Sequence, residues 1–248
     1  MFYKGYITYN SKASNGFSGF KLIMTAPPEY VHSEIRQDVF VVPGRDGELY
    51  GKNTYRGDAT IKVSFDIVTS GTASNYTTAL NQLYSWLSGN GMLIISDESA
   101  YYEVKKVIIT TDQRTILNYG KIDVEFVVYP YKFLIESPAT ITTLSIQNTH
   151  DDSYPLYAMT KSGALGVAQT LTITVNGNSF SVECPANAVL VYVDTRKKIS
   201  YAEISGVNTE VSASGDYEKL ILPGNSTTTI TTNNVNILAT TPRWGYKI

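Results

Sequence analysis

The sequence predicts a mainly β protein of two domains, and three observations support this fold class. Apolar and polar residues alternate with a period of two over most of the chain, as in the segment 61–68. Only the segment 74–87 has helical periodicity. Two prolines, Pro130 and Pro138, are followed by a long stretch rich in Thr, Ser, Asn and Gly. We therefore expect one β domain with a single helix and a second domain made of β-strands.

Strands in the first domain are predicted from alternation and from β-branched content. They fall at residues 3–9, 21–24, 39–42, 61–68, 92–96, 101–110 and 121–128. Together they are enough for a sheet or sandwich with one buried face.

The segment 74–87 is predicted to form a helix of three to four turns. Its apolar side chains fall on one helical face at Tyr76, Leu80, Leu83 and Leu87. Gly89 and Gly91 follow the last turn, where a left-handed residue commonly ends a helix. We interpret the apolar face as core contact with the sheet.

A long connection separates the predicted strands 39–42 and 61–68. Residues 43–59 contain few apolar side chains, and a loop of that length is unusual inside a compact domain. We predict an extended hairpin arm that turns near Gly44–Gly47; a floppy surface loop is the alternative.

The first domain is expected to span residues 1–136 and the second residues 137–248. Asn176-Gly177 lies between two alternating runs and predicts a hairpin with a type I′ turn. The second-domain strands are predicted at residues 171–175, 180–182, 188–193, 199–203, 219–222, 227–232 and 235–239, with the Thr-rich 227–232 as an edge strand. Short strands at regular spacing indicate a β-sandwich.

Charge and composition point to protein surfaces rather than to polyanions as partners. Twenty Lys and Arg against 22 Asp and Glu leave a formal charge of -2, so the sequence has no cationic excess for nucleic acid. At 17% charged residues and 19 Tyr, the chain has sparse charge and many amphipathic rings. Such a composition suits surfaces that other protein subunits cover.

The sequence predicts no enzyme, no cofactor and no metal site. Cys184 is the only cysteine, and His32 and His150 are the only histidines, so metal frameworks and catalytic triads lack their residues. No nucleophile elbow or phosphate loop is present. No apolar run approaches the roughly 18 residues of a membrane span, so we expect no membrane insertion.

Aromatic residues of the second domain are candidate contacts for an outward partner or a glycan. They are Tyr154, Tyr157, Tyr192, Tyr201 and Trp244. A carbohydrate-binding β-sandwich, such as a host-surface lectin, is therefore the alternative function.

Several motifs of the first domain occur in a recognisable order. They are Gly16–Gly19, Pro43–Gly47 followed by Tyr50-Gly51, the strand 61–68, a helix closing with Trp86-Leu87, Leu93–Asp97, Tyr101–Val104, and Val124–Phe126 running into Tyr129–Lys132. In this order they resemble the distal tail proteins of long, non-contractile-tailed (siphovirus-type) phages. The resemblance covers about residues 1–136.

The resemblance implies a structural virion protein at the distal end of the tail tube. Such proteins form a homohexameric ring whose lumen passes DNA, between the major tail tube protein and the tail-associated or central fibre protein. It also implies that residues 1–136 form the ring and that residues 137–248 are a galectin-like β-sandwich, which in some phages holds receptor-binding or baseplate proteins. Assembly would take place in the host cytoplasm. The second domain lacks the His-x-Asn-x-Arg motif of sugar-binding galectins, so lectin activity is not implied.

In a ring, the predicted arm would grip the neighbouring subunit, because each subunit must bury two different lateral faces. The candidate interface residues are Pro43, Gly44, Arg45, Asp46, Gly47, Tyr50, Tyr55 and Arg56.

Overall fold

The computed structural model describes residues 4–44, 46–70, 73–135 and 141–248. The chain divides into two compact units, residues 1–132 with 247–248 and residues 133–246. The predicted boundary at 136/137 lies four residues from this division. As predicted, the described chain is mainly β with one α-helix.

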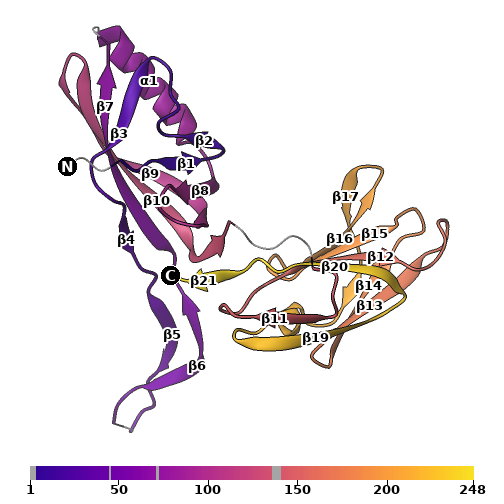
Figure 1. The fold of residues 1–248 in the computed structure, drawn as a ribbon. Helices are drawn as coiled ribbons and strands as arrows, with labels where there is room; N and C mark the ends of the chain where they lie inside the picture. Colours follow the sequence, from indigo (N-terminus) through magenta and orange to yellow (C-terminus); the bar gives the residue numbers. More distant parts are fainter. Residues whose placement is uncertain (1–3, 45, 71–72, 136–140) are drawn as a thin grey trace. The chain divides into compact units, whose positions relative to one another are not determined.

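The first unit is built on an antiparallel sheet with strand order β2-β1-β8-β9-β10-β7-β3, and β4 pairs with β7 beside β3 (Figure 1). Its strands are β1 (Ile7–Tyr9), β2 (Lys12–Ala13), β3 (Phe20–Met24), β4 (Glu29–Val31), β7 (Ala59–Thr69), β8 (Gly91–Ile95), β9 (Ala100–Ile116) and β10 (Tyr119–Leu134). Strand β9 runs past its predicted end at residue 110 because its outer part is exposed and does not alternate clearly. Strand β10 extends beyond the predicted 121–128 at both ends.

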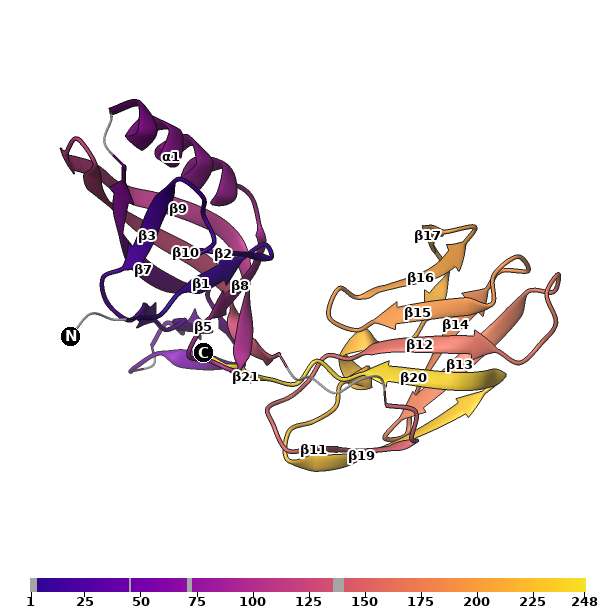
Figure 2. The same cartoon turned by 45° about the horizontal axis from the view of Figure 1, so that its top comes forward.

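Helix α1 (Ala73–Trp86) covers one face of this sheet (Figures 1 and 2). The predicted helical face is confirmed: Tyr76, Leu83 and Leu87 are buried in the same core as β7 and β10. Helix α1 can pack closely on β10 because Gly120 of β10, which has no side chain, faces Tyr76 of the helix. A Cβ at that position would lie 2.0 Å from the Tyr76 hydroxyl oxygen.

The arm is a separate two-stranded sheet of β5 (Ile35–Phe40) and β6 (Leu49–Arg56), which Figure 1 shows extending away from the main sheet of its unit. The extended hairpin is therefore confirmed. It begins earlier than predicted, because the segment 39–42, expected in the main sheet, contributes to the arm. Alternation alone does not show which partner a strand pairs with.

The second unit is a β-sandwich of two five-stranded antiparallel sheets (Figure 2). One has the order β11-β19-β13-β14-β18 and the other β17-β16-β15-β12-β20. The strands are β11 (Ser145–Asn148), β12 (Leu156–Lys161), β13 (Gln169–Val175), β14 (Asn178–Cys184), β15 (Leu190–Asp194), β16 (Ile199–Ile204), β17 (Val207–Glu210), β18 (Ala213–Ser214), β19 (Ser226–Asn233) and β20 (Val235–Thr241). The last strand, β21 (Gly245–Lys247), is not part of the sandwich sheets and pairs with β10.

The hairpin β13–β14 confirms the turn predicted at Asn176-Gly177. Both residues have positive φ, 47° and 83°, as a type I′ turn requires. The inward side chains of both strands, including Ile173 and Phe180, are buried in the core.

Two predictions for this unit are wrong. The Thr-rich β19 is an internal strand, between β11 and β13, and its Thr228 is fully buried. Residues 217–220 form a 3₁₀ turn (η1, Tyr217–Leu220) in place of the expected strand at 219–222, because the Asp216 carboxylate accepts the Glu218 N–H at 3.0 Å and caps the turn.

Two buried charged side chains tie loops of the sandwich together. Asp194 accepts the backbone N–H groups of Arg196 and Lys197, both at 3.1 Å, and forms a bidentate pair with Arg243 at 2.8 Å. The ammonium group of Lys161 donates to the carbonyl oxygens of Val167, Pro185 and Ala186. These bonds satisfy both charges inside the sandwich.

Candidate functional site

The arm exposes its side chains on both faces. Every residue of β5 is exposed, including Val39 at 47% and Phe40 at 57%. Val41 at 76% and Tyr50 at 62% continue this surface toward the tip. A two-stranded hairpin with no buried face is marginally stable in water, so this apolar surface suits a protein partner.

The turn at the arm's tip depends on glycine. Gly44 and Gly47 have φ of 81° and 83°, values that other residues rarely adopt. Pro43 and Asp46 are exposed in the same connection, and Arg45 lies outside the described residues. Tyr50, Tyr55 and Arg56 are in β6. The candidate interface residues thus occupy the tip and one strand of the hairpin.

The pairing of the two arm strands is interrupted by a β-bulge, where one strand has more residues than the other. Gln37 pairs with Thr54 and Val39 pairs with Tyr50, so one residue, Asp38, faces three, Gly51–Asn53. Gly51 fits closely there, since a Cβ on it would lie 3.2 Å from the Asp38 Cβ. Such a bulge bends and twists a strand pair.

The root of the arm is anchored to the first unit. The Gly57 N–H donates to the Glu34 carbonyl at 2.8 Å and closes the hairpin. Arg56 Nη1 donates to Ser33 Oγ and to the Ile248 carbonyl oxygen, both at 3.3 Å, and Ser33 Oγ also donates to that carbonyl. Arg56 is therefore an anchoring residue at the root, away from the apolar tip.

A small pocket of about 220 Å³ lies beside this root. We call it the root pocket; it is lined by Tyr30, Val31, His32, Ala59, Thr60, Ile61, Glu98, Tyr102, Lys132 and Ile248. Apolar side chains of β4 and β7 form much of it.

The Glu98 carboxylate organises the polar side of the root pocket. It accepts the hydroxyl of Tyr102 at 2.5 Å and that of Tyr30, and Lys132 Nζ lies 3.9 Å away. Burial, and then the bond to Glu98, raises the pKa of both tyrosines. Both hydroxyls therefore stay protonated, and the cluster positions side chains rather than transferring protons.

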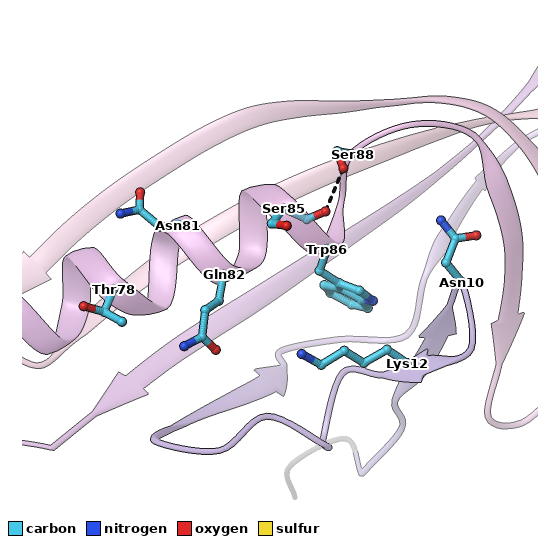
Figure 3. A pocket seen from close by; sticks show the side chains of 8 residues that line it. All are labelled: Asn10, Lys12, Thr78, Asn81, Gln82, Ser85, Trp86 and Ser88. Carbon is cyan, nitrogen blue, oxygen red and sulfur yellow. Dashed lines mark hydrogen bonds between the residues drawn. The ribbon is translucent and has the colours of Figure 1, made fainter.

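A second hollow is the polar groove between α1 and the β1–β2 turn, with a volume of about 710 Å³ (Figure 3). Its lining residues are Asn10, Lys12, Thr78, Asn81, Gln82, Ser85, Trp86 and Ser88. Lys12 carries the only charge among them, and α1 itself has no charged residue. The Trp86 indole is mostly buried and donates to the Tyr9 carbonyl at 3.0 Å. The scarcity of charge in this lining is one feature that it shares with the buried part of protein interfaces.

The structure corrects two of the five aromatic candidates in the second unit. Tyr157 is fully buried, with its hydroxyl donating to the Leu220 carbonyl at 2.8 Å. Trp244 is 6% exposed and belongs to the core. Both face inward on the sandwich, so neither is an outward contact.

Three candidates remain at the surface of the sandwich. Tyr154 is half-buried, and Tyr192 and Tyr201 are stacked, with ring centroids 5.0 Å apart. The carbohydrate-binding alternative thus loses two of its rings, including the tryptophan best suited to stack on a sugar.

The described residues contain no group of three or more His, Cys, Asp or Glu side chains placed to hold a metal ion. Cys184 is buried, and burial raises the pKa of its thiol. His150 Nδ1 pairs with the Tyr246 hydroxyl at 2.9 Å. No described helix is long and apolar enough to cross a membrane.

Comparison with known proteins now adds a domain match within the first unit and a fold. Residues 17–128 match the family model of the phage tail protein RIFT-related domain. No curated protein sequence matches the chain significantly.

Three solved structures share the fold over nearly the whole chain. The Dit protein of phage SPP1, described as a paradigm of the hub adsorption apparatus in phages infecting Gram-positive hosts, has a TM-score of 0.65 at 13% identity, covering 98% of this chain and 99% of that one. A chain of the phage P2 baseplate in its activated conformation with calcium has a TM-score of 0.55 at 7% identity, covering 98% of each chain. A chain of the strontium form of the phage p2 baseplate has a TM-score of 0.52 at 7% identity, covering 95% of this chain and 96% of that one. The resemblance stated from the sequence is confirmed by the domain family and the fold.

Proposed function

Because residues 17–128 carry a phage tail protein RIFT-related domain, we propose that this protein is a structural hub at the distal end of a phage tail tube. The observation that carries the proposal is the arm, whose apolar side chains have no partner surface within the described chain. A protein that acts alone gains nothing from such a hairpin, whereas an assembly subunit uses it to bind its neighbour.

The proposed assembly is a homohexameric ring formed by the first unit. A protruding arm and the surface that receives it are different patches, so the contact is heterologous and closes into a ring when the rotation between subunits allows. The arm residues Pro43–Gly47, Tyr50 and Tyr55 would contact the neighbour, with Arg56 fixing the root.

The two axial faces of this ring would bind different proteins. We assign the major tail tube protein to one side and a tail-associated or central fibre protein to the other. The groove beside α1, in which Lys12 is the one charged lining residue, is suited to such a contact. The second unit, a galectin-like sandwich in this proposal, would bind receptor-binding or other baseplate proteins. The protein would be part of the virion, assembled in the host cytoplasm, and would have no enzymatic activity.

Shortening the arm tests the ring. Replacing the segment 37–54 by Asn-Gly keeps the root pair Arg36–Tyr55 and supplies a type I′ turn. We expect the purified variant to be a folded monomer, with wild-type circular dichroism and at least a hundredfold weaker self-association by light scattering. A control variant changes another turn of the first unit, replacing Leu117-Asn118 between β9 and β10 with Asn-Gly, and should still form rings. A shortened variant that assembles like the wild type would contradict the proposal.

If DNA passes through the lumen of the proposed ring, the protein should bind DNA only weakly. A channel that lets DNA slide needs no clustered cations, and the chain carries a formal charge of -2. We expect no shift of duplex DNA at low micromolar protein and physiological salt in a gel-shift assay. A tight complex would count against a channel role.

A further inference from the structure

The root pocket lies at one end of the arm, and an exposed apolar segment lies at the other. Val31 and His32 of the pocket immediately precede the residues that close the arm's root, Ser33 and Glu34. The exposed apolar side chains Phe40, Val41 and Val42 lie at the far end. We propose that the Phe40–Val42 end of one subunit's arm docks into the root pocket of the next subunit. This inference rests on the proposed function and names its contact.

The arm cannot fill its own pocket. The six residues of β5 separate root from tip, and at about 3.3 Å per residue this places the tip roughly 20 Å away. The pairing of β5 with β6 keeps the strands extended, so the tip does not fold back. The occupant must come from another chain, and a tip-to-root contact repeats from copy to copy.

The size and lining of the root pocket suit side chains of a protein. Its volume of about 220 Å³ is below the roughly 300 Å³ at which small-molecule sites begin. Val31 is 42% exposed and Tyr30 38% exposed at its edge, although both belong to a strand beside the core. An inserted aromatic or branched side chain would bury these surfaces together with its own.

The described residues of the tip include two carboxylates, Asp46 and Glu48. In the pocket, Lys132 Nζ lies 3.9 Å from the Glu98 carboxylate, which also accepts two tyrosine hydroxyls. In the proposed contact, a tip carboxylate would share Lys132 with Glu98 beside the apolar lining.

Chemical cross-linking between two variants tests this contact directly. The single cysteine, Cys184, is fully buried, so an introduced cysteine is the reactive one. We would prepare Val41→Cys at the tip and Val31→Cys at the pocket separately, mix them, and add a short bismaleimide. We expect the mixture to give at least tenfold more cross-linked dimer than Val41→Cys mixed with Val207→Cys, a control residue that is 63% exposed on β17. A chain carrying both Val41→Cys and Val31→Cys should give a ladder ending at six.

A second pair of variants tests whether the contact between tip and pocket stabilises self-association, which cross-linking of nearby cysteines alone does not show. Phe40→Asp and Val31→Asp each place a carboxylate in the proposed contact, and both positions are exposed, so folding should be unaffected. Each should weaken self-association at least tenfold by light scattering, with an unchanged unfolding midpoint.

The outcomes distinguish this contact from the ring itself. Hexamers that give no more tip-to-pocket product than the control would overturn this inference and leave the proposed function standing. Monomers without cross-links would contradict both. Cross-linked open chains would support the contact and contradict the closed ring.

Discussion

The protein contains two hairpins with similar chemistry and opposite surroundings. In β13–β14, both strands bury one face, and Leu171, Ile173 and Phe180 are at most 1% exposed. In β5–β6, no described residue of β5 is buried. Both turns use glycine at a φ of 83°, Gly177 in one and Gly47 in the other. The first hairpin is thus covered by its own chain, whereas β5 of the second has no buried residue in the described chain, as the proposed contact with a neighbouring subunit requires.

The largest expected difference between the two hairpins is in the free energy of unfolding lost when a phenylalanine of each is replaced by alanine. Phe180→Ala removes a ring that is 1% exposed and should lower the free energy of unfolding of the second unit by about 3–5 kcal/mol. Phe40→Ala removes a ring that is 57% exposed and should change it by less than about 0.5 kcal/mol in the monomer. Hydrogen exchange in urea, read on amides of β13–β14 and β7, measures both. Equal losses would contradict the comparison.

The next effect concerns acid stability of the sandwich. Burial opposes ionisation of Asp194, but the bonds from Arg243 and Lys197 more than offset it, so its pKa is lowered. A lowered pKa stabilises the fold above the ordinary value of about 3.9, and this contribution is lost as the pH falls through the lower folded value. Asp194→Asn should cost about 2 kcal/mol at pH 7 and flatten the acid limb of the unfolding curve.

The arm supplies the control for this acid experiment. Asp46 is exposed at the tip, so Asp46→Asn should change the free energy of unfolding of the monomer by less than about 0.5 kcal/mol. If Asp194→Asn showed the same acid limb as the wild type, the buried pair would not be the source of the pH dependence.

The smallest effect compares the two turns. Gly177→Ala forces a Cβ into a positive φ within a buried hairpin and should cost about 1 kcal/mol in the unfolding of the second unit. Gly47→Ala introduces the same strain at an exposed tip outside the core, so we expect no change in the global unfolding of the first unit. Thermal melts of the two variants, compared with the wild type, check this; a larger loss for Gly47→Ala would show that the arm supports its own unit.

The sequence was informative wherever local chemistry decides the structure. The helix predicted at 74–87 is α1, Ala73–Trp86, because its apolar face matches a sheet surface. Asn176-Gly177 forms the predicted turn because a type I′ turn needs positive φ at both of its central residues, and few other residue pairs adopt it. The arm was also predictable, since residues 43–59 lack the apolar alternation of a core segment.

Other features depend on contacts between distant segments. Tyr157 faces inward on β12 together with Met159 and Lys161. Because one of these buried residues is a lysine, the sequence alternation does not show which face of β12 points to the core. The Lys161 ammonium group is acceptable there only because three carbonyls of two loops converge on it. The root pocket combines β4, β7, Glu98 and Ile248, and no local pattern links these segments.

The unequal strands of the arm have a consequence for how its length can vary. Three residues of β6 face one of β5, so β6 holds two extra residues, an even number. Because side chains alternate with a period of two, the outer half of β6 keeps the same face as the inner half. Deleting one of these residues would turn every outer side chain of β6 over, while deleting both would preserve the faces and straighten the bend. We therefore expect insertions and deletions at this point to be tolerated only in pairs, and in the proposed ring the bend would set the angle at which each arm reaches its neighbour.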